Sequence, residues 1–232
     1  MPLPPQHAWE VRPAEAIAIQ RELRERIRLT AYDGPIRYLG GTDLSYNRFS
    51  NTAHAVVVLL DYETLQLVGY AAVTSEMTFK YIPGLLSFRE IPPLLRAWEQ
   101  LPIEPDITLV DGHGYMHPRR MGIATHLGMM TGKPTIGCAK KMLVGTHPEL
   151  PRTRGSYMPI THQNELVGHA LRTKDGINPM YISPGTEIGF DQAHQIALHA
   201  ARGYRLPEPT RQAHLTVNQL RRGELEPGFL WL

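Results

Sequence analysis

Two aspartates of this sequence stand where a carboxylate is expected to take part in chemistry. Asp111 directly follows the strand-like run 107–110. In an open α/β sheet the carboxyl ends of parallel strands face the ligand crevice, so a functional role competes there with that of a turn or capping aspartate. Asp43 lies in a strand-like stretch beside Gly40 and Gly41. Unless that strand is an exposed edge, the charge of Asp43 needs a partner, and a metal ion is one answer.

Glu90 gains meaning only in combination with the two aspartates. It lies on a helix predicted over 85–101, and a helical glutamate is usually just solvated. Two aspartates and a glutamate from three separate elements could surround a hard cation, and Mg²⁺ takes oxygen ligands while keeping several waters. Such a site suits hydrolysis of a phosphodiester, because the metal activates water and neutralises the leaving oxygen.

The run 111–120, DGHGYMHPRR, is dense in polar groups. His113 and His117 are four residues apart, but the glycines and proline around them argue against the helix that would aim both at zinc. A histidine that positions or deprotonates water is the better interpretation. Four basic residues near these elements could meet phosphates or simply be surface charges. They are Arg119, Arg120, Lys140 and Lys141.

A stiff turn, Tyr81-Ile82-Pro83-Gly84, precedes the helix that carries Glu90. A tyrosine and an apolar residue on a rigid loop could wedge between stacked bases. A packed structural turn is the equally good alternative.

Two kinds of segment position these residues. Strand-like stretches over 36–44, 54–61 and 66–78 have short links and predict an antiparallel meander. Beyond it, helices alternate with short strands, which indicates parallel pairing. The expected later elements are helices over 85–101, 122–131, 190–202 and 209–222 and strands over 106–110, 133–139, 165–173 and 180–183, with a further helix over 14–29 before the meander. We expect one mixed α/β domain over residues 1–232, with a kink or restart of the second helix at Pro92 and Pro93.

Composition supports an ordinary globular chain. Of its 232 residues, 42% are hydrophobic and 20% are charged. Cys138 is the single cysteine, so neither an intramolecular disulfide nor a cysteine zinc cage can form. The longest apolar run, 55–60, is far too short to span a membrane, and no secretory signal is visible, so we expect a soluble cytoplasmic protein. The formal charge of +2 does not exclude a nucleic-acid enzyme, because acidic metal ligands offset basic contacts.

Five ordered blocks of the chain resemble the endonuclease V family, the deoxyinosine 3′-endonucleases of DNA repair. The blocks are GTDLS at 41–45, YIPG with FRE at 81–84 and 88–90, VDGHG with HPRR at 110–114 and 117–120, GCAKK at 137–141, and GYRLPEPTR at 203–211. They run in order from about residue 36 to about residue 214, a span that covers most of the chain, so chance agreement is negligible. The resemblance implies a ribonuclease-H-like mixed sheet.

The resemblance also implies catalytic roles. Asp43, Glu90 and Asp111 correspond to the acidic site, with Mg²⁺ held by the two aspartates and Mn²⁺ as a substitute. Lys140 corresponds to a lysine near the scissile phosphate, and His214 to a histidine close to the metal.

Contacts to DNA follow from the same resemblance. The segment 81–83 corresponds to a strand-separating wedge, preceded here by Lys80 where the family usually has proline. Backbone groups at glycines are expected to approach the edge of a flipped base, because glycine lets backbone come close. The residues expected to contact DNA are Tyr81, Ile82, Pro83, Gly84, Gly112, Gly114, His117, Arg119 and Gly122. His117 and His126 also fall on family histidines.

The implied reaction is hydrolysis of the second phosphodiester bond 3′ to deoxyinosine, which leaves a nick. DNA containing deoxyinosine is thus the expected partner of a monomer that needs no membrane. One alternative is cleavage of inosine-containing single-stranded RNA. Others are a non-catalytic lesion-binding protein, which would gain nothing from carboxylates facing phosphate, and a zinc hydrolase built on His113 and His117.

Overall fold

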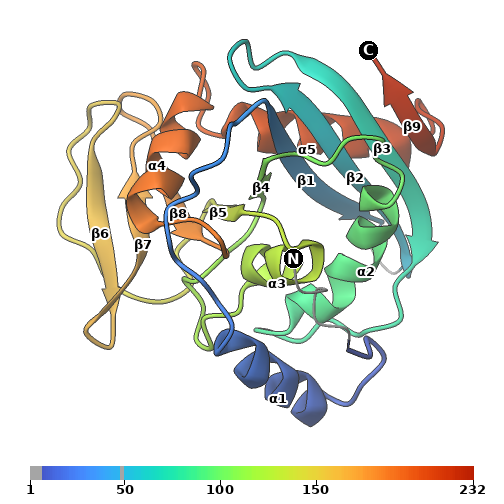
Figure 1. Cartoon of the computed structure of the whole chain (residues 1–232), viewed down its shortest axis with the longest axis horizontal. Helices are drawn as coiled ribbons and strands as arrows, with labels where there is room; N and C mark the ends of the chain where they lie inside the picture. The colour runs from blue at the N-terminus through green and yellow to red at the C-terminus, as the bar shows by residue number, and fades with distance from the viewer. Residues whose placement is uncertain (1–6, 48–49) are drawn as a thin grey trace.

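The computed structural model describes residues 7–47 and 50–232, and its strands join in one mixed sheet (Figure 1). The strands are β1 (Tyr38–Tyr46), β2 (Thr52–Asp61), β3 (Leu67–Glu76), β4 (Ile107–Val110), β5 (Thr135–Ala139), β6 (Tyr157–His162), β7 (Glu165–Leu171), β8 (Met180–Pro184) and β9 (Gly228–Trp231). The helices are α1 (Pro13–Arg24), α2 (Leu86–Trp98), α3 (Ile123–Thr131), α4 (Phe190–His199) and α5 (Glu208–Arg221). The order across the sheet is β6-β7-β8-β5-β4-β1-β2-β3-β9.

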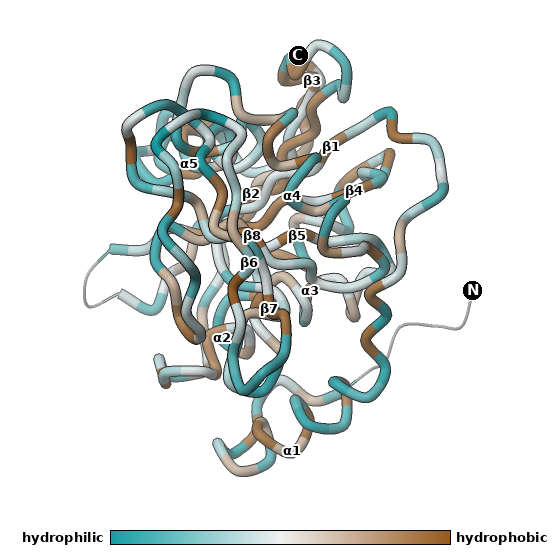
Figure 2. The backbone as a smooth tube through the Cα atoms, turned by 90° about the vertical axis from the view of Figure 1, so that its left-hand side faces the viewer, coloured by the Kyte–Doolittle hydropathy of each residue, from teal (hydrophilic) through white to brown (hydrophobic). Residues whose placement is uncertain are grey.

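Helices cover both faces of the sheet because the central strands are apolar on both sides. Alternate residues of β2, among them Val56 and Val58, pack against α5, while Ala55 and Val57 pack against α2 and α3. This two-residue alternation explains the unbroken apolar run of β2. In Figure 2 the hydrophobic segments gather along the central strands, and the outer loops are largely hydrophilic.

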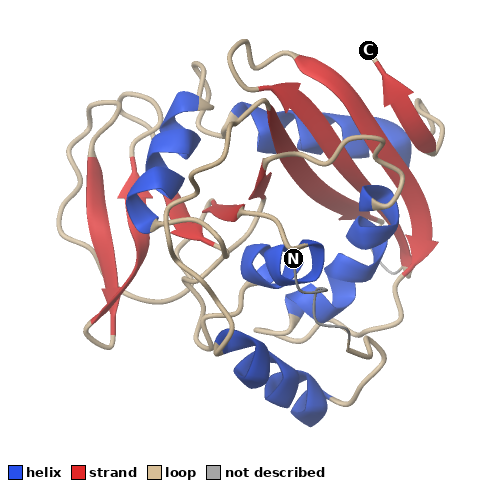
Figure 3. Cartoon of the chain, viewed as in Figure 1, coloured by secondary structure: helices blue, strands red, loops and turns tan. Residues whose placement is uncertain are grey.

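The mixed α/β class and the antiparallel meander β1–β2–β3 are confirmed. The parallel part is limited to β1, β4 and β5, because β8 runs antiparallel to β5 and continues into the antiparallel pair β6–β7 at the far end of the sheet (Figure 3). The last residues form β9, which pairs with β3. Strand direction depends on contacts between distant segments, which local pattern does not report.

Three predicted helices end earlier than expected: those over 85–101 and 190–202 end at Trp98 and His199, and the third is the first helix. The helix predicted over 14–29 ends at Arg24. The restart that was one of the two possibilities at Pro92 and Pro93 is absent, because α2 continues through both prolines, and Pro93 is buried. Packing thus offsets the backbone hydrogen bonds that the prolines cannot make. No helix in residues 7–47 and 50–232 is long and apolar enough to cross a membrane.

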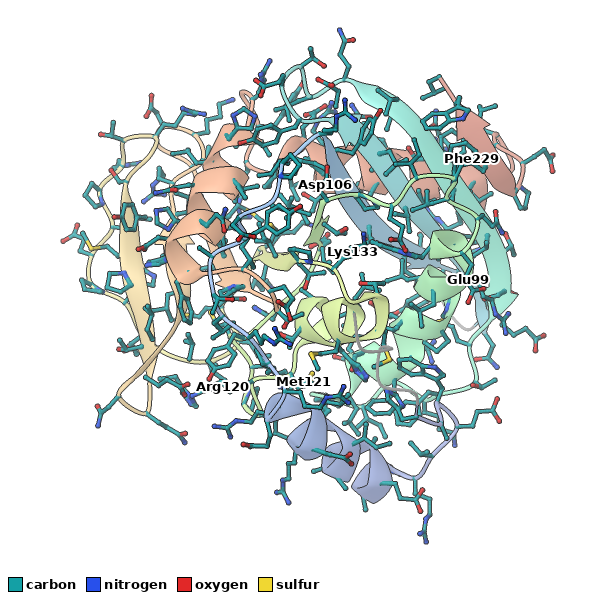
Figure 4. The ribbon with its side chains drawn as sticks, viewed as in Figure 1. Glu99, Asp106, Arg120, Met121, Lys133 and Phe229 are labelled. Carbon is teal, nitrogen blue, oxygen red and sulfur yellow. The ribbon has the colours of Figure 1, made fainter. Side chains whose placement is uncertain are left out.

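The register of β1 against β4 is anchored at their first residues. The Asp106 carboxylate, labelled in Figure 4, accepts the backbone N–H groups of Arg37 and Tyr38 at 2.7 and 2.9 Å. These hydrogen bonds help to fix which side chains lie next to each other at the carboxyl ends of the two strands.

Candidate active site

β1 brings Asp43 to the middle of the sheet, where α5 supplies a partner for its charge. The Asp43 side chain is only 14% exposed, and its Oδ2 accepts a hydrogen bond from Nδ1 of His214 at 2.9 Å. The close approach of α5 requires Gly41, because a Cβ there would lie 2.1 Å from the carbonyl oxygen of Pro209. Burial raises the pKa of Asp43, the charge of Asp111 raises it further, and His214 opposes both effects.

Asp111 and Lys140 follow the carboxyl ends of two neighbouring parallel strands, β4 and β5. The Lys140 ammonium donates to Oδ2 of Asp111 at 2.5 Å, with the two side chains 41% and 18% exposed. On the other side of β4, Thr42 of β1 lies opposite Val110. Asp43 and Asp111 each come one residue later, so both aspartates emerge at the same edge of the sheet.

Glu90 lies on α2, which packs together with α3 against one face of the sheet. Burial raises the pKa of Glu90 to about 8; the charge of Asp43 acts in the same direction, Arg89 opposes it, and Asp111 adds a further increase. In the absence of a cation, Glu90 therefore holds a proton at neutral pH. The three carboxyl groups, which we call the acidic edge, sense one another's charge.

The chemistry of the acidic edge fits a hard divalent cation bound partly through water. Carboxylate oxygens are the ligands that Mg²⁺ prefers, and a cation would relieve their mutual repulsion. Among the described residues, the group of three possible metal ligands whose donor atoms all lie within 4.8 Å of one another is elsewhere, and consists of His169, Asp191 and His194.

A small cavity opens beside the acidic edge, between the turn 81–84, the loop after β4 and the start of α3. Its volume is about 180 Å³, below the roughly 300–1,000 Å³ of sites for drug-sized ligands. The lining residues are Tyr81, Pro83, Gly84, Leu86, Ser87, Gly112, His113, His117, Met121, Gly122, Ile123 and Leu143. The cavity therefore suits one small group, and its lining begins one residue after Asp111, at Gly112.

Two histidines in the cavity wall are held neutral. Burial lowers the pKa of His113 to about 4, against an opposing effect of Asp111, and lowers the pKa of His117 to about 3. Nδ1 of His113 is buried and has no hydrogen-bond partner among the described residues. His126 is fully buried behind this wall, and its Nδ1 lies 2.9 Å from the Ser87 hydroxyl. The donor set that could hold a metal contains neither wall histidine, so the described residues lend no support to a zinc centre there.

Close backbone packing shapes the cavity. A Cβ on Gly122 would lie 2.2 Å from the carbonyl oxygen of His113, and the Gly122 N–H donates to the Gly114 carbonyl at 3.0 Å. Gly84 has a φ of +79°, a conformation that favours glycine. The protein's own backbone therefore needs these glycines, and a larger residue would reshape the cavity as well as narrow it.

The rim of the cavity is braced by Gln20, a residue that the sequence analysis did not single out. Its buried side-chain amide donates to the Gly84 carbonyl at 3.1 Å and accepts from Nε of Arg119 at 2.6 Å. Arg119 also donates to the Gly84 carbonyl at 2.6 Å. A signal was present in the sequence, because Gln20 lies between Ala16 and Leu23 on the buried stripe of α1.

Other expected contact residues pack wholly or partly against the protein itself. Ile82 packs against an apolar cluster beneath the turn, and Gly114 lies against the backbone of Pro184. Arg120, labelled in Figure 4, is no surface charge: its side chain is 3% exposed and pairs with Glu165 at 2.7 Å. The structure therefore brings together the expected catalytic residues and most of the expected cavity wall, and it assigns bracing contacts to Arg119 and Arg120.

Sequence comparison connects this chain with known proteins. The Endonuclease V family model matches residues 21–215. The chain is 47% identical over 219 residues to Endonuclease V of Gloeobacter violaceus, covering 93% of this chain and 89% of that protein. It is 45% identical over 223 residues to Endonuclease V of Myxococcus xanthus, covering 96% and 95%.

Solved structures show the same likeness. The crystal structure of the Endonuclease V from Streptomyces avermitilis has a TM-score of 0.88 and 38% identity, covering 94% of this chain and 96% of that one. A Ciona intestinalis Endonuclease V has a TM-score of 0.82 and 26% identity, covering 91% and 98%. That protein is in complex with a 23mer DNA containing an inosine followed by a ribo-adenosine.

Proposed function

This chain belongs to the endonuclease V family, and on that premise we propose that it is a metal-dependent endonuclease that nicks DNA at the second phosphodiester bond 3′ to deoxyinosine. Membership makes it a nuclease with a ribonuclease-H-like fold that hydrolyses DNA. The proposal adds which bond is cut, which ion is used, and that the chain acts as a monomeric single domain. The coupled acidic edge beside a base-sized cavity is the observation that carries it.

The acidic edge is the proposed cation site. Asp43 and Asp111 would hold Mg²⁺, with Mn²⁺ as a substitute, and Glu90 would join through water or directly. When bound, the ion supplies activated water and charge neutralisation for phosphodiester hydrolysis. The raised pKa of Glu90 supports this assignment, because a nearby positive charge would favour the ionised form.

Two basic residues complete the proposed chemistry. His214 donates from Nδ1 to Asp43 and so orients that carboxylate. Its half-exposed ring is also placed to exchange a proton with the reacting strand. Lys140 keeps its ammonium at the mouth of the site, beside Asp111, where it would stabilise negative charge on the phosphate.

The cavity is the proposed seat of the flipped hypoxanthine base. The Ciona intestinalis relative, held with inosine-containing DNA, supports an inosine ligand for this chain. Backbone groups near Gly84 and Gly112 would read the edge of the base, and the small volume would reject the 2-amino group of guanine. Tyr81, which is 63% exposed, would fill the space that the base leaves in the duplex.

The test is nicking of a duplex that carries one deoxyinosine, with both strands labelled and the cut mapped against a ladder. We expect one cut at the second bond 3′ to the lesion, loss of cutting with a chelator, and recovery with Mg²⁺. Asp43→Asn and Asp111→Asn should abolish nicking and keep lesion binding, while Asp33→Asn, at an exposed carboxylate elsewhere, should behave as wild type. Undiminished nicking by either variant, or by the chelated protein, would overturn the proposal.

A second substrate deserves a parallel assay because the DNA bound by the Ciona intestinalis relative carries a ribo-adenosine after the inosine. Matched strands should be compared with deoxyribose or ribose at the positions 3′ to inosine. Faster cutting of the all-ribose strand would assign inosine-containing RNA as the main substrate. Lesion binding without any cutting would instead identify a binding protein.

A further inference from the structure

A second cluster of metal-ligating side chains lies outside the acidic edge, between β7 and α4. His169 is on β7, and Asp191 and His194 are on α4; one donor atom from each lies within 4.8 Å of the others. The histidines are 5% and 4% exposed, whereas Asp191 is exposed. We propose that these three side chains form a binding site for Zn²⁺ that joins the sheet to α4.

The packing of α4 on the sheet brings the three side chains close together. His169 lies opposite Ile182 in the β7–β8 ladder, on the face where Ile182 packs with residues of α4. Asp191 and His194 are three residues apart, so they lie on the same side of the helix. Their convergence is thus a consequence of the helix docking on this part of the sheet.

The donor set favours zinc over magnesium. Two imidazole nitrogens and one carboxylate oxygen form a three-ligand set that zinc accepts with water in the fourth position. Imidazole suits zinc and related transition metals, while Mg²⁺ prefers oxygen ligands. The cluster and the acidic edge should therefore select different ions.

Neighbouring groups restrain the two imidazole rings and favour their neutral form. Nδ1 of His194 lies 3.3 Å from the carbonyl oxygen of Phe190. Because a carbonyl oxygen can only accept a hydrogen bond, the proton of the neutral ring is on Nδ1, and Nε2 keeps the lone pair that can bind a metal. The Tyr157 ring stacks on His194 at 4.1 Å and meets His169 edge-on at 5.3 Å, which restrains both rings. Burial lowers the pKa of both histidines, in agreement with neutral imidazoles.

Zinc binding requires the three donor atoms, which lie within 4.8 Å of one another, to come closer together. Tetrahedral coordination with bonds of about 2.0–2.1 Å sets ligand atoms about 3.3 Å apart. The exposed Asp191 carboxylate can rotate toward the two imidazole rings. Asp191 also suits the first turn of α4 as a negative charge at a helix start, and the histidines also pack in an aromatic group. Those roles account for each residue separately but not for the meeting of three donor atoms.

Zinc titration calorimetry of the full chain, in excess Mg²⁺ to occupy the acidic edge, tests this site. We expect one zinc equivalent per chain. His194→Asn should remove it, and Asp191→Asn should weaken it by at least the roughly tenfold that even outer-shell changes cost. Asp33→Asn, which removes an exposed carboxylate elsewhere, is the matched control and should bind as wild type.

Two results would overturn the proposal: no zinc binding by the wild-type chain, or binding by Asp191→Asn equal to that of the wild type and of Asp33→Asn. Asp191 is exposed, so its amide variant is expected to fold even if the histidine variant does not. Circular dichroism of each variant before titration checks this.

Discussion

The buried carboxyl group of Glu90 should make the metal-free protein less stable as the pH rises, and Glu90→Gln should remove that effect. The pKa of Glu90 is raised from 4.5 to about 8 in the folded state. Below pH 4.5 the group is protonated whether the chain is folded or unfolded, so it has no differential effect. Between these values only the folded chain keeps the proton, and stability is lost until the pH passes about 8.

The pKa difference sets the size of the effect. At about 1.4 kcal/mol per pH unit, the penalty reaches about 3 kcal/mol at pH 7 and levels off at about 5 kcal/mol above pH 8. For a chain of this length, 3 kcal/mol corresponds to a change in melting temperature of about 6–12 °C. A neutral glutamine of similar shape avoids this penalty, so Glu90→Gln should melt higher than wild type, increasingly so from pH 5 to about pH 8.

The assay is thermal unfolding in a chelating buffer from pH 5 to pH 9. The matched control is Glu99→Gln, at an exposed glutamate that follows the same helix and is labelled in Figure 4. It should follow the wild-type curve. Added Mg²⁺ should stabilise wild type more than Glu90→Gln, and the same variant should lose nicking activity. Parallel curves for wild type and Glu90→Gln across this pH range would refute the reasoning.

Three further predictions concern residues that position the site. Gly41→Ala should displace α5, because its Cβ would lie 2.1 Å from the Pro209 carbonyl oxygen. We expect the free energy of unfolding, measured with denaturant, to fall by about 1–3 kcal/mol and nicking activity to fall more strongly. Unchanged activity would contradict this. Glu165→Ala leaves the buried Arg120 charge without its carboxylate and should cost about 2 kcal/mol in the same assay, whereas Glu165→Gln should cost less; equal stability of all three proteins would refute the role of the pair. Tyr81→Ala, at a 63% exposed side chain, should leave the melting temperature within about 2 °C of wild type and slow nicking of duplex more than of single strands; equal slowing would count against a wedge.

Local features of the sequence determined much of this protein. The short links between three successive strand-like stretches predicted the meander β1–β2–β3. Asp43 and Asp111 could be singled out because a carboxylate within or just after an apolar strand requires an explanation. Five ordered blocks then indicated the family that the comparisons confirm.

Tertiary structure alone decided how those residues work. The pairs Asp43–His214 and Asp111–Lys140, the raised pKa of Glu90, and the antiparallel direction of β8 each depend on segments that are distant along the chain. The burial of Arg120 and the cluster at His169 have the same origin. Periodicity reports which face of one segment is apolar, because that property is local. Desolvation, charge coupling and strand direction are set by which segments meet, and that is a property of the whole fold.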